Sequence, residues 1–142
     1  MKKLISILIL CLFTQVCFSA DRKMETDLNA AIELAQKDNK LIFIKYGRDV
    51  RCGNCVHLNK LINQRAVRIS DSEFVLVNLN CDDPVDSKSF RSLYGDSFKD
   101  AKTLPFVVIA KADGTLISSV SSYQNADSYN KFIMSAKSKS KK

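Results

Sequence analysis

An apolar run that precedes two closely spaced cysteines by a short loop constrains the fold of this 142-residue chain more than any other feature. The run LIFIKY, residues 41–46, is rich in apolar, β-branched and aromatic residues, which is typical of a strand covered on both faces. After a short polar loop, RCGNCVHL at residues 51–58 opens a helical pattern with Cys55 and Leu58 on one face. A strand that leads into a helix in this way predicts an α/β domain with Cys52 and Cys55 at the start of the helix.

Helical and strand-like patterns alternate along the rest of the chain. Helices are predicted at residues 26–38, from Cys52 onward, at 84–95 and at 125–136, and strands at 41–46, 74–80, 106–109 and 116–120. We expect Gly95 to end the third helix and Asp113-Gly114 to form a hairpin turn between the last two strands. The helical crossover makes the first two strands parallel and the hairpin makes the last strand antiparallel, so the pattern predicts a four-stranded mixed sheet flanked by helices on both faces.

Residues 1–20 have the layout of a secretory signal peptide. Two lysines, Lys2 and Lys3, precede an apolar block that ends in the small residues Ser19 and Ala20. The block is short for a membrane-spanning helix and is interrupted by polar residues, so an uncleaved anchor is the weaker interpretation. We therefore expect a cleaved, exported protein, periplasmic or secreted, with a single domain over residues 21–136.

The positive charge of the chain lies mostly at its two ends. Cleavage of the signal peptide lowers the formal net charge from +7 to +5, and four lysines of the C-terminal segment SAKSKSKK account for most of the rest. We expect residues 137–142 to form a basic disordered tail, which could contact anionic lipid or an acidic partner. Since the basic residues are not interleaved with aromatic ones, nucleic-acid binding is not expected, and the domain is expected to be a monomer.

Export favours disulfide formation, because thiols in an oxidising compartment tend to pair. The mature chain holds three cysteines, so at most one internal pair can form. We expect Cys52 to pair with Cys55 and Cys81 to remain free.

The chain resembles the thioredoxin-like family, in particular its small exported members. The resemblance rests on LIFIKYGRDVRCGNCVHL, on TLPFVVI followed by the DGT hairpin, and on the closing helix, and it covers nearly all of the mature chain. It implies a thioredoxin fold and an exported thiol-disulfide oxidoreductase that exchanges its dithiol or disulfide with protein thiols and disulfides. No bound cofactor is needed, because the electrons pass to or from a second dithiol protein, which in a bacterium would be a membrane-embedded partner.

The position of the cysteines at a helix N-terminus suits that chemistry. Unpaired backbone N–H groups and the helix dipole favour a thiolate at Cys52. Cys52 is then the nucleophile that forms a mixed disulfide with the substrate, and Cys55, one turn further in, resolves it. The direction of electron transfer, that of a reductase or of an oxidase, cannot be transferred from relatives, because Gly53-Asn54 between the cysteines matches neither thioredoxin nor the strong oxidases. Of the two, we expect a reductase.

Four residues are expected to contact the substrate. Gly53 and Asn54 lie between the cysteines, and the resemblance assigns Leu104-Pro105 to the loop that shapes the substrate groove. Pro105 on sequence grounds alone could be a trans proline that opens an edge strand. The resemblance implies instead a cis peptide bond beside the cysteines, with the backbone of Leu104 free to pair with an extended substrate.

Two positions depart from the thioredoxin pattern. Lys45 stands where thioredoxin has a buried aspartate; we expect its side chain to reach solvent, the alternative being a buried lysine that accepts a proton or favours a thiolate. Arg51 stands where a tryptophan normally precedes the motif. Arg48 and Arg51 could stabilise a thiolate or could be solvated loop residues.

Other interpretations of the cysteine motif remain open. Haem attachment is disfavoured because Val56 separates Cys55 from His57, which is expected to be a solvated helix residue. Zinc would require Cys52, Cys55, His57 and Cys81 together, and no metal is expected. Cys81 is expected to be a small, partly buried residue near the active-site rim, or else a third reactive thiol. The alternative function is a non-enzymatic thioredoxin-like binding module in which the cysteines hold a metal ion or a static disulfide.

Overall fold

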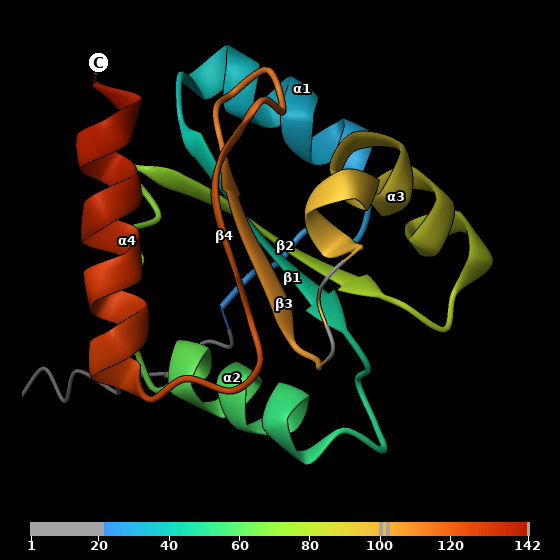
Figure 1. Ribbon diagram of the computed structural model, residues 1–142. Coiled ribbons are helices and arrows are strands. Elements are labelled where there is room, and N and C mark those ends of the chain that lie inside the picture. Colours follow the sequence, from blue (N-terminus) through green and yellow to red (C-terminus); the bar gives the residue numbers. More distant parts are fainter. Residues whose placement is uncertain (1–21, 100, 102, 142) are drawn as a thin grey trace, which may run out of the picture.

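The strands and helices occur in the order that the sequence predicts. The structure, a computed structural model, describes residues 22–99, 101 and 103–141 (Figure 1). Its elements in chain order are α1 (Leu28–Asp38), β1 (Leu41–Gly47), α2 (Gly53–Asn63), β2 (Phe74–Asn80), α3 (Pro84–Phe98), β3 (Phe106–Ala110), β4 (Leu116–Ser121) and α4 (Ala126–Ser140). The predicted signal peptide, residues 1–20, lies outside the described residues.

The four strands form one mixed sheet in the order β2-β1-β3-β4. β1 pairs with β2 in parallel and with β3 antiparallel, and β4 is antiparallel to β3. β1 therefore lies inside the sheet, and positions 42–47 of this strand are all buried. The predicted four-stranded mixed sheet with flanking helices is confirmed.

Two helices cover each face of the sheet. On the face covered by α1 and α3, which we call the α1/α3 face, Ile42, Ile44 and Tyr46 of β1 pack with apolar residues of both helices. On the opposite face, the α2/α4 face, Phe43 packs with Leu58 of α2 and with apolar residues of α4. Successive strand residues point to opposite faces, so Lys45 and Gly47 belong to the α2/α4 side of β1. Figure 1 shows the helices on either side of the sheet.

Side chains cap the N-terminus of each helix. Asp27, Asp83 and Asn125 accept hydrogen bonds from backbone N–H groups of α1, α3 and α4. These oxygen acceptors are the residues that helix N-termini prefer. The cap of α2 is instead the sulfur of Cys52, which accepts from the Cys55 N–H at 3.3 Å.

Two predicted boundaries are wrong. α3 continues past Gly95 to Phe98, because Phe98 packs edge-on against Tyr46 and Phe106, with ring centroids at 5.2 and 5.3 Å. This packing offsets the modest cost of a glycine inside a helix.

The C-terminal segment also differs from the prediction. Residues 137–140, expected to be disordered, continue α4, whose Ala136 is buried and whose Lys137 forms an ion pair with Glu73. Anchoring at residues 136 and 137 holds the last turn of the helix in place despite its charge. Of the helices within the described residues, none is long and apolar enough to span a membrane.

Candidate active site

The two cysteines of the motif form a disulfide at the N-terminus of α2. The Cα atoms of Cys52 and Cys55 are 5.2 Å apart, and the pairing is the one expected from the sequence. Cys55 is fully buried, whereas Cys52 is partly exposed. An incoming thiol can therefore reach the outer sulfur and not the inner one.

Gly47, the last residue of β1, lies directly beneath the disulfide. A Cβ atom at this position would lie 2.9 Å from the Cys55 sulfur and 3.7 Å from the Cα atom of Pro105. Even an alanine would therefore collide with the sulfur. Gly47 allows β1, the disulfide and Pro105 to meet, and sequence reasoning did not single it out.

Pro105 lies close to Gly47 and therefore close to the disulfide. The Leu104-Pro105 peptide bond is cis, as the family resemblance implied. Pro105 is buried, and Leu104 before it is partly exposed beside the cysteines. The structure thus brings Cys52, Cys55, Leu104 and Pro105 together.

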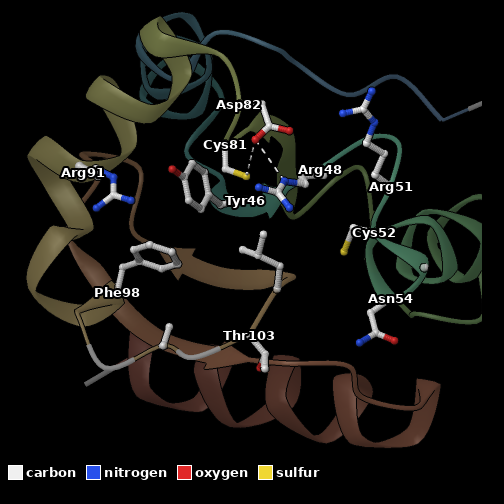
Figure 2. Close-up of a pocket in the computed structure, with 13 residues that line it drawn as sticks. Tyr46, Arg48, Arg51, Cys52, Asn54, Cys81, Asp82, Arg91, Phe98 and Thr103 are labelled. Carbon is white, nitrogen blue, oxygen red and sulfur yellow. Dashed lines mark hydrogen bonds and ion pairs between the residues drawn. The ribbon is translucent and has the colours of Figure 1, made fainter.

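An open groove of about 680 Å³ extends from Cys52 along this side of the molecule. We call it the cysteine groove (Figure 2). Gly53 and Asn54 border it at the start of α2, and both are exposed. The remaining lining residues come from β1 and the loop after it, the end of β2, α3 and the segment before Pro105: Tyr46, Arg48, Arg51, Cys81, Asp82, Arg91, Phe98, Ala101, Thr103 and Leu104. All four residues expected to contact substrate therefore lie at or beside the groove.

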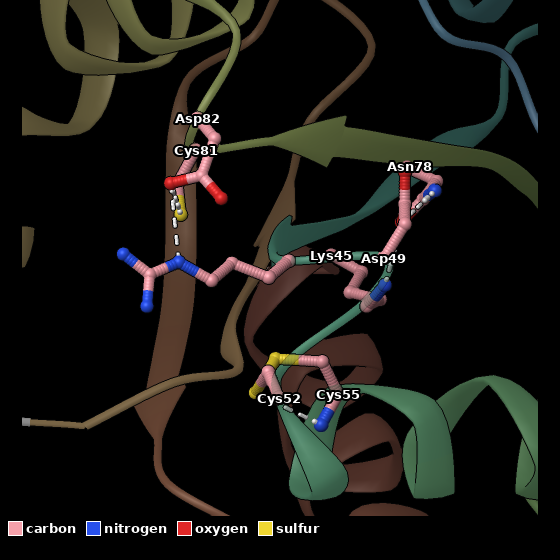
Figure 3. The surroundings of a disulfide bond; sticks show 8 residues. Lys45, Asp49, Cys52, Cys55, Asn78, Cys81 and Asp82 are labelled. Carbon is pink, nitrogen blue, oxygen red and sulfur yellow. Dashed lines mark hydrogen bonds and ion pairs between the residues drawn. A yellow bond between two sulfur atoms is a disulfide. The ribbon is translucent and has the colours of Figure 1, made fainter.

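Lys45 is buried, and the expectation that it reaches solvent is wrong. Its side chain is 0% exposed, and its ammonium donates to the Asn78 Oδ1 at 2.8 Å and lies 3.6 Å from the Asp49 carboxylate. Asn78 in turn donates to Asp49 at 3.0 Å. These partners lie in the surroundings of the disulfide and compensate the buried charge (Figure 3).

The protonation of Lys45 is set by two opposing influences. The pKa of the Lys45 ammonium lies below its ordinary value, because the effect of burial outweighs the opposing effect of the Asp49 carboxylate. In its protonated form, Lys45 adds positive potential on the α2/α4 side of β1, the side on which the cysteines lie, and this potential favours a thiolate.

The two arginines of the loop before Cys52 behave differently. Arg48 is engaged by Asp82, with its Nε 3.1 Å from the carboxylate. Arg51 is exposed beside Cys52 and has a left-handed backbone with φ of 64°. Arg48 is therefore partly neutralised, whereas Arg51 presents its charge at the mouth of the groove.

Cys81 is a free, partly buried cysteine that lines the same groove as Cys52. Burial and the neighbouring Asp82 carboxylate raise the pKa of the Cys81 thiol, and Arg48 opposes them. A raised pKa lowers the fraction of Cys81 that is present as the thiolate, the reactive form, at neutral pH.

His57 does not take part in the cysteine groove. It is exposed on α2, and its Nε2 lies 3.1 Å from the Tyr123 hydroxyl. In the part of the chain that the structure describes, no three side chains of the metal-binding types gather in one place.

The aromatic wall of the groove was also missed by sequence reasoning. Phe98 falls beyond the helix end predicted at Gly95, and the sequence predicts Tyr46 only as a strand residue. Arg91 packs over the Phe98 ring, with its guanidinium carbon 5.1 Å from the ring centroid. The pattern of α3 carried a weak signal, since Arg91 and Phe98 are seven residues apart and hence on one helix face.

Comparison with known proteins gives structural neighbours but no sequence relative. No protein-family model and no curated protein matches the chain. Among solved structures it is similar to a candidate disulphide isomerase from Bacteroides thetaiotaomicron, with a TM-score of 0.64, 17% sequence identity and coverage of 82% of this chain and 92% of that one. It is also similar to a disulphide isomerase from Xylella fastidiosa Temecula1, with a TM-score of 0.59, 18% identity and coverage of 79% and 95%. A third neighbour is the DsbH oxidoreductase, with a TM-score of 0.55, 16% identity and coverage of 87% and 91%.

These likenesses extend over most of each chain and agree with the four-stranded mixed sheet in the order β2-β1-β3-β4. The chain has the thioredoxin fold.

Proposed function

We propose that this protein is an exported thiol-disulfide oxidoreductase that reduces disulfides in other proteins. The observation that carries the proposal is the pairing of a partly exposed Cys52 with a fully buried Cys55 at the N-terminus of α2, beside the cis Leu104-Pro105 bond and at one end of the cysteine groove. The names of the three structural neighbours, two disulphide isomerases and an oxidoreductase, support the same chemistry.

The reaction follows from the different exposure of the two sulfurs. In the reduced protein the Cys52 thiolate attacks one sulfur of the substrate disulfide; a bond from Cys52 to the substrate forms, and the other substrate sulfur leaves as a thiolate and takes a proton. Cys55, deprotonated, then attacks the Cys52 sulfur. The Cys52–Cys55 disulfide forms, the second substrate thiol is released, and two electrons have passed from the protein to the substrate.

The surroundings of Cys52 support the reductive direction. A couple becomes strongly oxidising when its thiolate form is heavily stabilised. Here the Cys52 sulfur accepts a hydrogen bond from the Cys55 backbone N–H, whereas Arg48 donates to Asp82 and Lys45 to Asn78. Lys45 and Arg48 are thus directed to other partners, which leaves the exposed Arg51 and the N-terminus of α2 to stabilise the thiolate, and we expect this stabilisation to be moderate.

Export and the electron donor are part of the proposal. The basic start and apolar block of residues 1–20 support cleavage after Ala20, and intact-mass measurement of the protein recovered from the periplasm of an expressing bacterium tests it. After each turnover a second dithiol protein must return two electrons to the Cys52–Cys55 disulfide.

The test is the catalysed reduction of insulin disulfides by dithiothreitol. The mature protein is expected to accelerate the reaction, Cys52→Ser to abolish the acceleration, and Cys81→Ser to retain it. When reduced Cys55→Ser is freed of dithiothreitol and mixed with insulin, it is expected to accumulate as a covalent Cys52 adduct with the substrate, which mass spectrometry detects.

A full rate with Cys52→Ser, or no acceleration by the folded wild-type protein, would contradict the enzyme and favour a binding module. Circular dichroism of each variant separates loss of chemistry from loss of fold.

A further inference from the structure

The cysteine groove carries an excess of positive charge. Among the described residues that line it, Arg48, Arg51 and Arg91 are basic and Asp82 is acidic. The N-terminus of α2 adds a partial positive charge beside Cys52. Three arginines against one aspartate give these lining side chains a formal net charge of +2.

The arginines differ in how far they are already engaged. Arg48 and Asp82 form an ion pair at 3.1 Å. Arg51 is exposed next to Cys52, and Arg91 lies at the far end of the groove, as Figure 2 shows. The two unneutralised charges thus flank the groove at its two ends.

Arg91 is held in a defined orientation. Its Nε donates to the Ser87 hydroxyl at 3.3 Å, and its guanidinium packs over the Phe98 ring. A guanidinium has five N–H donors, so this contact leaves the terminal N–H groups able to bind a carboxylate in bidentate fashion. An arginine fixed in this way loses little side-chain entropy on binding.

The rest of the groove can accommodate an extended peptide segment. Phe98 and Leu104, which are both partly exposed, supply apolar surface in the groove. A groove of about 680 Å³ is large enough for several residues of an extended chain.

We infer that the groove selects acidic substrates: extended peptide segments whose disulfide-bonded cysteine is flanked by aspartate or glutamate. One carboxylate of the segment binds near Arg51, next to the reacting sulfur, and a more distant one binds Arg91. The inference rests on the proposed function and specifies the substrate class of the same site. Like charges across the groove make lysine-rich segments poor substrates.

Three peptides of equal length test the inference, each with one central cysteine as a mixed disulfide with thionitrobenzoate and flanked by glutamate, glutamine or lysine. The release of thionitrobenzoate by the reduced mature protein is followed at low ionic strength. Division by the rate with dithiothreitol removes the intrinsic reactivity of each peptide. The glutamate peptide is expected to react about tenfold faster than the glutamine peptide, because a field of complementary charge raises encounter rates. Added salt is expected to shrink the difference.

Matched variants locate the effect. Arg91→Gln is expected to lower the glutamate-to-glutamine rate ratio about threefold, as loss of one groove charge should. Arg91→Lys, which keeps the charge, is expected to restore most of the ratio. Lys131→Gln removes the same charge from an exposed position of α4 outside the groove and is expected to leave the ratio unchanged.

Equal normalised rates for the three peptides, or the same loss of preference in Lys131→Gln as in Arg91→Gln, would overturn the inference while leaving the reductase intact. Failure of the reduced protein to react with any of the peptides would overturn the proposed function, and the substrate class with it.

Discussion

The two faces of β1 are built on different principles. On the α1/α3 face, Ile42, Ile44 and Tyr46 are buried, and Tyr46 stacks on Phe90 with ring centroids 4.0 Å apart. On the α2/α4 face the same strand presents Phe43, then the buried Lys45, then Gly47 beneath the disulfide. The α1/α3 face of β1 is apolar along its whole length. The α2/α4 face carries first an apolar residue, then a charged one, and finally a glycine without a side chain next to Cys55.

This difference indicates that the α1/α3 face contributes mainly to stability, and that the part of the α2/α4 face nearest the disulfide contributes to the redox chemistry. An apolar face stabilises the fold by burial alone. A buried lysine costs free energy unless partners compensate it, and a glycine in a strand contributes no packing. The α2/α4 face departs from ordinary core packing at the two positions nearest the disulfide, and this is the region to which we assign the redox function.

Phe90 tests the apolar face and has the largest expected effect on stability. Phe90→Ala removes a ring that packs against Tyr46, Tyr94, Phe98 and Phe106. We expect the free energy of unfolding to fall by about 3 to 5 kcal/mol, measured by urea denaturation of the oxidised protein. The reduction potential of the Cys52/Cys55 couple, measured under conditions where the variant is folded, is expected to stay unchanged. A shift in reduction potential as large as that of a variant on the α2/α4 face would contradict the claim that the α1/α3 face affects stability and not the redox chemistry.

Gly47 tests the contact between β1 and the disulfide. Gly47→Ala places a methyl group 2.9 Å from the Cys55 sulfur, and the overpacking is expected to cost about 1 to 3 kcal/mol in the oxidised protein. The cost should be smaller after reduction, because a free Cys55 side chain can move. The potential of the variant should therefore become less negative.

Gly53→Ala is the matched control. A Cβ at this position meets no atom within 4 Å, so the substitution is expected to leave stability unchanged or slightly raise it. Equal unfolding free energies for Gly47→Ala and the wild type would show that the close approach of strand and sulfur does not constrain the site.

Lys45 has the smallest expected effect. Lys45→Met keeps an unbranched buried side chain, one heavy atom shorter than lysine, but removes the positive charge beneath the cysteines. Loss of a cation makes the thiolate form less stable, so the couple should become more reducing, by about 30 mV, which is about 1.4 kcal/mol for two electrons. Redox titration measures the shift, with Lys60→Met, an exposed lysine of α2, as control. An unchanged or less negative potential in Lys45→Met would contradict the electrostatic role of this lysine.

Local patterns were sufficient to predict the fold, because the helices show a helical hydrophobic period, the strands are short apolar runs, and the connections restrict the topology. The errors came where tertiary contacts outweigh local preference. Gly95 is a common helix terminator, yet α3 continues because Phe98 has an aromatic cluster to join. The last turn of α4 is held by Lys137 and Glu73, which are distant in sequence.

The site was predictable in its cysteines and less so in its surroundings. Cys52, Cys55 and Pro105 belong to a local motif or a family pattern. Lysine is normally exposed, so the burial of Lys45 follows only from the position of β1 inside the sheet and from Asn78 on the neighbouring strand. The charge of the groove depends on Arg91, which lies 39 residues beyond Cys52 and reaches the site only through the fold.

The reduction potential of the Cys52/Cys55 couple tests the account most directly. The mature protein is equilibrated in dithiothreitol buffers of known potential, its free thiols are alkylated, and the reduced fraction is read by mass spectrometry. The account predicts a reversible two-electron couple nearer the roughly −270 mV of thioredoxin than the roughly −120 mV of a strong oxidant. A couple close to the latter value would contradict the reductive direction, and a disulfide that shows no reversible titration in this range would contradict the enzyme itself.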